Sequence, residues 1–169
     1  MIFSCTKKVL DKLKKYKTIK LETEPAHLFN WYVDLLVLER KTYFLFTNSE
    51  NLFSFILYAG TKKEHQNIEN LFEQKLRETI IREISSSEDV INKAFPSEEN
   101  YKFTKTNSRS TLGTMNELKH DAKVILNYNS GKMSKEYDRI NHTLPRIIFR
   151  SIQYDKPLDR MKEALKTKW

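Results

Sequence analysis

The sequence predicts a single α+β domain in which a small, mainly antiparallel sheet is covered by amphipathic helices. Three observations lead to this prediction. Residues 31–59 contain three apolar segments separated by short polar turns, as in an antiparallel meander. Residues 64–84 carry apolar side chains at helical spacing. The strands and helices are segregated along 169 residues without a long linker, which favours one α+β domain over an alternating βαβ fold.

The N-terminal part of the chain predicts a strand followed by a helix. Residues 2–5 form a short apolar run, and we expect Cys5 within it to be a buried thiol. Thr6 is a candidate N-cap for the helix that follows, which presents an apolar stripe and several lysines. Pro25 excludes a helix interior, so residues 17–29 are predicted to be an extended connection.

The meander supplies the sheet and most of the predicted core. Its three strands read WYVDLLVL, TYFLFTN and LFSFILYA, and the turns between them contain ERK and SEN. Apolar residues are consecutive in LLVL and FILY, which predicts at least one strand covered on both faces. The last strand, LFSFILYA, is a candidate exposed edge or oligomer face.

Helical patterns dominate the rest of the chain. The long helix at residues 64–84 should cover the sheet, and a short helix ends at Pro96. Residues 101–106 predict one more strand. Thr114 and Glu117 have the spacing of a capping box, which places the start of the next helix after Gly113. Further helices are expected around 133–140 and after Pro157.

The charge of the chain is distributed unevenly. There are 30 Lys and Arg against 22 Asp and Glu, a formal charge of +8. Residues 1–20 carry +6, residues 21–100 carry −6 and residues 101–169 carry +8. The basic ends either converge on one face and meet an external anion such as nucleic acid, or partly neutralise the acidic middle within the fold.

Several classes of protein are excluded by what the sequence lacks. No run of about 18 apolar residues is present, so we expect no membrane span. The first five residues lead directly into lysines and lack the apolar region of a signal peptide. A single cysteine fits a reducing cytoplasm, where we expect the protein to reside. The scattered histidines match no ligand spacing, so no metal and no cofactor are expected.

Residues 102–113 are the most function-like segment, because basic and hydroxyl side chains gather at a predicted strand-to-helix transition. Free N–H groups and the helix dipole favour an anion there, and an arginine offers a planar fork to phosphate. The candidate site comprises Lys105, Thr106, Arg109, Ser110 and Thr111, with Lys7 and Lys8 as possible neighbours. The alternative is that these hydroxyls cap a helix and that Arg109 pairs with an acid of the middle section.

Three stretches resemble an uncharacterised family of small bacterial, plasmid and phage proteins. They are CTKKVLDKL at the start, NWYVDLLVLERKTYFLFTN in the hairpin, and TKTNSRSTLGTMNEL; HTLPR and YDKPL resemble a later part of the family. The resemblance brings no established activity or cofactor. It implies a mobile-element context and draws attention to Cys5, Thr6, Lys7, Lys8, Trp31, Arg40, Lys105, Thr106, Arg109, Ser110 and Asn116.

Three hypotheses about function follow. The first is a non-enzymatic accessory protein of a mobile element that binds nucleic acid or a phosphate-bearing ligand through residues 102–113. The second is a protein-interaction module that binds a host protein or forms a homo-oligomer through the apolar hairpin. The third is an enzyme acting on a phosphorylated substrate, which lacks an evident catalytic base or metal set.

Overall fold

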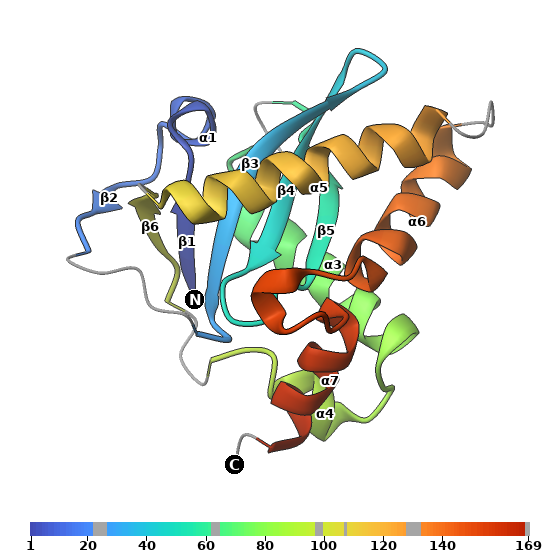
Figure 1. Ribbon diagram of the computed structural model, residues 1–169. Coiled ribbons are helices and arrows are strands. Elements are labelled where there is room, and N and C mark those ends of the chain that lie inside the picture. The colour runs from blue at the N-terminus through green and yellow to red at the C-terminus, as the bar shows by residue number, and fades with distance from the viewer. Residues whose placement is uncertain (22–26, 62–64, 97–99, 107, 128–132, 168–169) are drawn as a thin grey trace.

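A six-stranded mixed sheet lies at the centre of the molecule (Figure 1). The computed structural model describes residues 1–21, 27–61, 65–96, 100–106, 108–127 and 133–167. The strands are β1 (Ile2–Cys5), β2 (Thr18–Ile19), β3 (Asn30–Leu38), β4 (Lys41–Asn48), β5 (Ser54–Tyr58) and β6 (Lys102–Lys105). Their order across the sheet is β2-β6-β1-β3-β4-β5.

The predicted meander is confirmed, and the sheet is mixed rather than mainly antiparallel. Strands β3, β4 and β5 pair antiparallel. However, β1 pairs parallel with both β3 and β6, and β2 pairs parallel with β6. Parallel partners are joined by long crossovers, so no local sequence pattern marks their pairing. Strand β2 lies in the segment that was predicted to be an extended connection.

The β3–β4 hairpin closes through Glu39 and Arg40, the first two residues of the predicted ERK turn. Their φ angles are 44° and 64°. Positive φ at both central residues is the geometry of the two-residue hairpin turn whose twist matches that of the strands. Glycine is usual there, so Glu39 and Arg40 adopt a conformation that the hairpin as a whole must stabilise.

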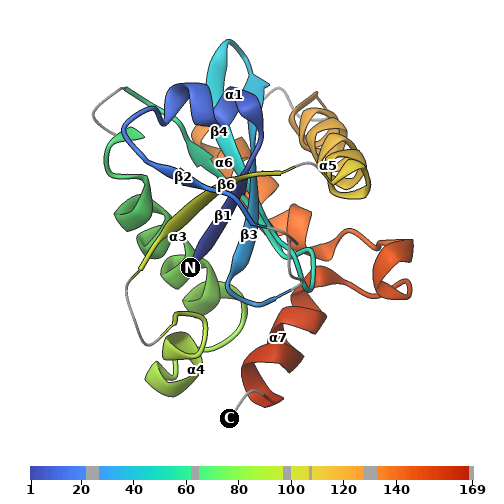
Figure 2. The same ribbon diagram turned by 90° about the vertical axis from the view of Figure 1, so that its left-hand side faces the viewer.

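Helices cover both faces of the sheet, giving three layers (Figure 2). Figure 2 shows α3 and α4 on one side of the sheet and α5 on the other. The helices are α1 (Lys7–Lys12), α3 (Ile68–Glu83), α4 (Glu88–Asn92), α5 (Arg109–Asn127), α6 (Met133–Thr143) and α7 (Pro157–Thr167), with 3-10 turns η1 (Leu144–Arg146) and η2 (Arg150–Ile152). None of the described helices combines the length and apolarity that a bilayer span requires.

Alternation of side chains along the strands builds two separate cores, one on each face. Trp31 packs into the first core, which α3 and α7 complete, and its neighbour Tyr32 packs into the second, which α5 and α6 complete. The consecutive apolar residues of the meander therefore serve both faces, as predicted. Cys5 lies in the first core, and burial raises the pKa of its thiol, which confirms the expectation of a buried cysteine.

Helix α5 begins earlier than predicted. Its first residue is Arg109, so Gly113 lies inside the helix rather than before it. The predicted capping box of Thr114 and Glu117 is therefore wrong, because both residues are in the helix interior. Ser108 performs the capping instead, since its Oγ accepts a hydrogen bond from the backbone N–H of Thr111 at 3.3 Å.

Strand β5 is an edge strand, as predicted, but a side chain occupies its outer hydrogen-bonding groups. Asn141 of α6 is fully buried. Its Oδ1 accepts a hydrogen bond from the N–H of Ile56 at 2.7 Å, and its Nδ2 donates to the carbonyl of Ile56 at 3.2 Å. The amide thus takes the place that a neighbouring strand would occupy at the centre of β5.

Candidate anion-binding site

Strands β1 and β6, which lie in the two basic segments of the chain, end side by side. These strands are neighbours, and Cys5 lies opposite Lys105 in their register. The ladder continues one residue further, because the N–H of Thr106 donates to the carbonyl of Cys5 at 2.9 Å. The residues that follow β1 therefore start beside those that follow β6. Lys7 and Lys8 on one side and Arg109 on the other thus begin the two helices that follow these neighbouring strands.

The chain leaves these two strands toward opposite faces of the sheet. Helix α1 follows β1 and packs Val9 into the core of α3, whereas α5 follows β6 and packs Met115 and Leu118 into the other core. In Figure 2, α1 lies above the sheet and α5 to its right. Adjacent parallel strands whose connections diverge in this way form the switch point at which open α/β sheets bind ligands.

Four cations flank this end of the sheet, at the starts of α1 and α5 and at the end of β6. Lys7, Lys8, Lys105 and Arg109 are all exposed. Within the described ranges, no carboxylate forms an ion pair with any of them. The alternative in which Arg109 pairs with an acid of the middle section is therefore not seen among the described residues. The edge is left with uncompensated positive charge, which is suited to an external anion.

The hydroxyl groups of the segment have mainly structural roles. Thr106 is buried, and its Oγ1 accepts a hydrogen bond from the N–H of Ser108 at 3.4 Å. The hydroxyl of Thr111 donates to the Oγ of Ser108 at 2.9 Å. Both threonines therefore stabilise the first turn of α5. This agrees with the alternative prediction, in which the hydroxyl groups of this segment cap a helix. Asn107 lies outside the described residues.

Ser110 and Thr111 line a cavity of about 180 Å³ between α5 and the β4–β5 connection. Its other lining residues include Thr47, Glu50 and Ser151, and no lysine or arginine is among them. A carboxylate among hydroxyl groups suits a neutral polar group rather than an anion. Ser110 and Thr111 thus follow Arg109 in sequence but line a cavity of different chemistry.

Asp34 is a polar residue at this edge that the sequence analysis missed. It is 6% exposed in the middle of β3. Its Oδ1 accepts hydrogen bonds from the hydroxyl of Thr6 and from the N–H of Leu35, both at 2.8 Å. Its Oδ2 forms an ion pair with Lys119 of α5 at 2.6 Å. A lone acid in the apolar run WYVDLLVL is the signal that could have found it, because buried carboxylates require partners.

The Asp34 carboxylate ties together the elements that frame the edge. Thr6 occupies the N-cap position of α1, yet its hydroxyl bonds Asp34 rather than capping the helix. The same carboxylate holds α5 through Lys119. Strand β3, the start of α1 and the middle of α5 are therefore fixed to one another. This fixes the positions from which the four exposed cations project.

Comparisons with known proteins find one family. A model described as a domain of unknown function, DUF6933, matches residues 2–160. No curated protein and no solved structure matches the chain. The match confirms the expectation of an uncharacterised family, while an origin in plasmids or phages stays a prediction.

Proposed function

The chain belongs to the DUF6933 family, a domain of unknown function, and from the geometry of its sheet we propose that it binds nucleic acid through phosphate groups held at the carboxyl ends of β1 and β6. The observation that carries the proposal is the parallel pairing of β1 with β6, because Lys7 and Lys8 follow β1 while Lys105 ends β6 and Arg109 begins the helix after it. Lysine and arginine are the usual phosphate ligands in such interfaces.

The charge of the whole chain supports a polyanionic ligand. With a formal charge of +8, the protein retains excess positive charge after all its acidic residues are counted. Long-range attraction of this kind raises the rate at which a charged polymer is captured. The binding is expected to be independent of base sequence, because contacts to phosphates carry no sequence information.

This proposal retains the accessory role in a mobile element, and a cytoplasmic location, that the sequence analysis expected. Direct interaction with a host protein or with a second copy through β5 is less favoured, because Asn141 occupies the edge at Ile56. An enzymatic role at the carboxyl ends of β1 and β6 is also less favoured. Both oxygens of Asp34 already accept hydrogen bonds, which leaves this carboxylate poorly placed to act as a base.

Fluorescence anisotropy with labelled single-stranded and double-stranded oligonucleotides tests the proposal. The wild-type protein should bind at low salt, and the logarithm of the binding constant should fall linearly with the logarithm of the salt concentration. Substitution Arg109→Ala should weaken binding to all sequences alike and reduce the salt slope by about 1.

The matched control is Arg139→Ala. Arg139 is exposed on α6, so its substitution removes the same charge at a distance from the start of α5 (Figure 1). It should change affinity much less than Arg109→Ala. An absence of binding at low salt, a flat salt response, or equal effects of the two substitutions would each contradict the proposal.

A further inference from the structure

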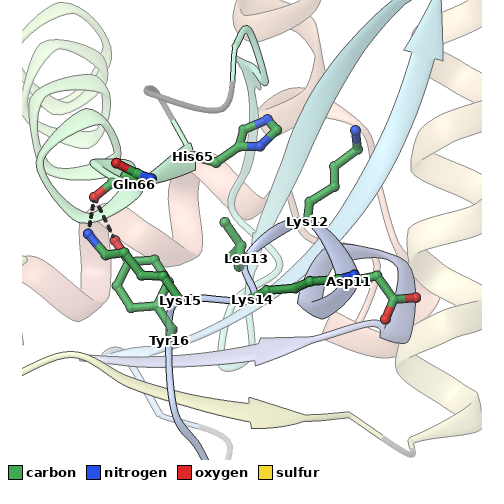
Figure 3. Close-up of a pocket in the computed structure, with 8 residues that line it drawn as sticks. All are labelled: Asp11, Lys12, Leu13, Lys14, Lys15, Tyr16, His65 and Gln66. Atoms are coloured by element: carbon green, nitrogen blue, oxygen red, sulfur yellow. Dashed lines mark hydrogen bonds between the residues drawn. The ribbon is translucent and has the colours of Figure 1, made fainter.

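A second basic site lies at the other end of α1. A pocket of about 440 Å³ is formed by residues 11–16, which end α1 and follow it, together with His65 and Gln66 just before α3 (Figure 3). Its volume falls within the range of small-molecule sites. The sequence predicted a helix with several exposed lysines in this segment, and it did not predict a pocket.

The lining of the pocket is strongly basic. Lys12, Lys14 and Lys15 contribute three positive charges, and Asp11 is the one carboxylate among the lining residues. With His65 neutral, the formal charge of the lining is +2. Neither Lys12 nor Lys14 forms an ion pair in the part of the chain that the structure describes. A ligand with two negative charges would therefore balance the lining.

His65 adds a polar group that has no partner. Its Nε2 atom is buried and makes no hydrogen bond within the described residues. The ring packs edge-on against Phe44, with 5.7 Å between the ring centroids. Figure 3 shows the imidazole ring of His65 directed toward the side of the pocket on which Lys12 lies, with Leu13 beneath the ring. Buried polar groups without a partner are rare in proteins and mark places where a ligand or water completes the bonding.

The opposite wall is held in place by contacts within the protein. The Nζ of Lys15 donates to the carbonyl of Gln66, and the Tyr16 hydroxyl donates to the same oxygen at 3.2 Å. The Tyr16 ring stacks on Phe103, with 4.1 Å between centroids. Burial and the nearby Glu69 carboxylate raise the pKa of Tyr16 to about 12, so its hydroxyl stays a donor at neutral pH. Lys12 and Lys14 remain the cations available to a ligand.

We propose that this pocket binds a small molecule bearing a phosphate monoester, held by Lys12 and Lys14 with His65 at its side. A phosphate monoester carries close to two negative charges at neutral pH, which matches the lining. Lysine recognises phosphate as a point charge. The inference goes beyond the proposed function, because a small molecule is bound at the opposite end of α1 from the edge that holds nucleic acid.

Isothermal titration calorimetry of the full chain with adenosine 5′-monophosphate, inorganic phosphate and adenosine tests the inference. The monophosphate and inorganic phosphate should bind, whereas adenosine, which lacks the phosphate, should not. The double substitution Lys12→Ala and Lys14→Ala should weaken binding of the monophosphate at least about tenfold. The ring signals of His65 in NMR spectra should shift on addition of the monophosphate, and those of His27 should not.

Two controls separate this site from the rest of the surface. Lys123→Ala with Lys166→Ala removes the same charge from exposed positions on α5 and α7, and binding should stay within about twofold of wild type. Arg109→Ala should weaken oligonucleotide binding but leave monophosphate binding unchanged. The inference is overturned if neither phosphate compound binds, if adenosine binds equally well, or if Arg109→Ala weakens monophosphate binding as much as the double substitution does.

Discussion

Glu83 ends α3 with its side chain only 3% exposed, although it carries a charge. Its carboxylate accepts hydrogen bonds from Arg82 at 2.7 Å and from Arg146 at 2.5 Å, and it lies 3.1 Å from Nδ1 of His142. Burial on its own would raise the pKa of Glu83, but the hydrogen bonds from these three residues outweigh burial and lower the pKa to about 2. The carboxylate thereby joins α3 to α6 and η1.

This lowered pKa predicts a loss of stability in acid. A carboxyl group whose pKa is lower in the folded state stabilises the protein fully above its unfolded pKa, and the stabilisation is lost as the pH falls toward the folded value. For Glu83 this stabilisation should be lost as the pH falls from about 4.5 to about 2. It should amount to roughly 2 kcal/mol in the free energy of unfolding.

Urea unfolding of wild type and Glu83→Gln across this pH range measures the effect. The difference in unfolding free energy between the two proteins should be largest at neutral pH and should shrink as the pH falls through the range. Because the other carboxyl groups are common to both proteins, the difference isolates Glu83. A constant difference across the range would contradict this assignment.

At the scale of single residues, sequence patterns indicated which side chains are buried better than they indicated which side chains form ion pairs. The apolar runs correctly placed Cys5 and Trp31 in the core. The ion-pair partners that join Asp34 and Glu83 to other elements are distant in sequence, 85 residues away for Lys119 and 63 for Arg146. No local spacing encodes such pairs, because an ion pair depends on which elements pack together.

Helix α6 protects the free edge of β5 through one side chain, and this leads to a prediction about Asn141. Substitution Asn141→Ala would leave the N–H and the carbonyl of Ile56 without partners at the sheet edge. We expect a loss of about 2 kcal/mol in the free energy of unfolding. We also expect concentration-dependent self-association, because an unpaired edge can add a strand from a second chain.

Light scattering coupled to size-exclusion chromatography, together with thermal unfolding, tests this prediction. The matched control is Asn116→Ala, which removes the same side chain from an exposed position on α5. The control should remain at the mass and the unfolding temperature of the wild type. If Asn141→Ala behaves like the control in both measurements, the protective role of the amide is refuted.

At the scale of elements, five of the six strands and most helices could be predicted, whereas β2 and the start of α5 could not. Residues 2–5 and the meander were correctly predicted as strands because alternation and apolar content are local signals. The start of α5 was misplaced because Thr114 and Glu117 imitate a capping box, while Ser108 is the residue that caps. Ser108 has the right chemistry for a cap, so the signal was present but was outweighed by Gly113.

The two cores share the strands between them, and this determines how the whole molecule should unfold. Trp31 belongs to the core beneath α3, and Leu118 of α5 is fully buried in the core on the other face. Both cores are built on β3 and β4. Loss of one core exposes the same strands that support the other, so we expect a single cooperative transition.

The substitution Leu118→Ala tests this coupling. It should destabilise the protein by about 3 kcal/mol. The fluorescence transition of Trp31, on the opposite face, should shift to the same extent as the circular dichroism transition. The measurement uses a Trp169→Phe background so that Trp31 is the only tryptophan. A Trp31 transition that does not move, or that separates from the dichroism transition, would show that the cores unfold independently.

The sequence by itself determined the α+β class, the meander, the buried cysteine and the uneven distribution of charge, because each depends on residues that are close together in the chain. Only the tertiary structure decided which charged segments of the chain are neighbours. Strands β1 and β6 are about 100 residues apart in sequence and pair in parallel, and no local pattern encodes that pairing. Their pairing brings the starts of α1 and α5 to the same end of the sheet, from which the two helices leave toward opposite faces.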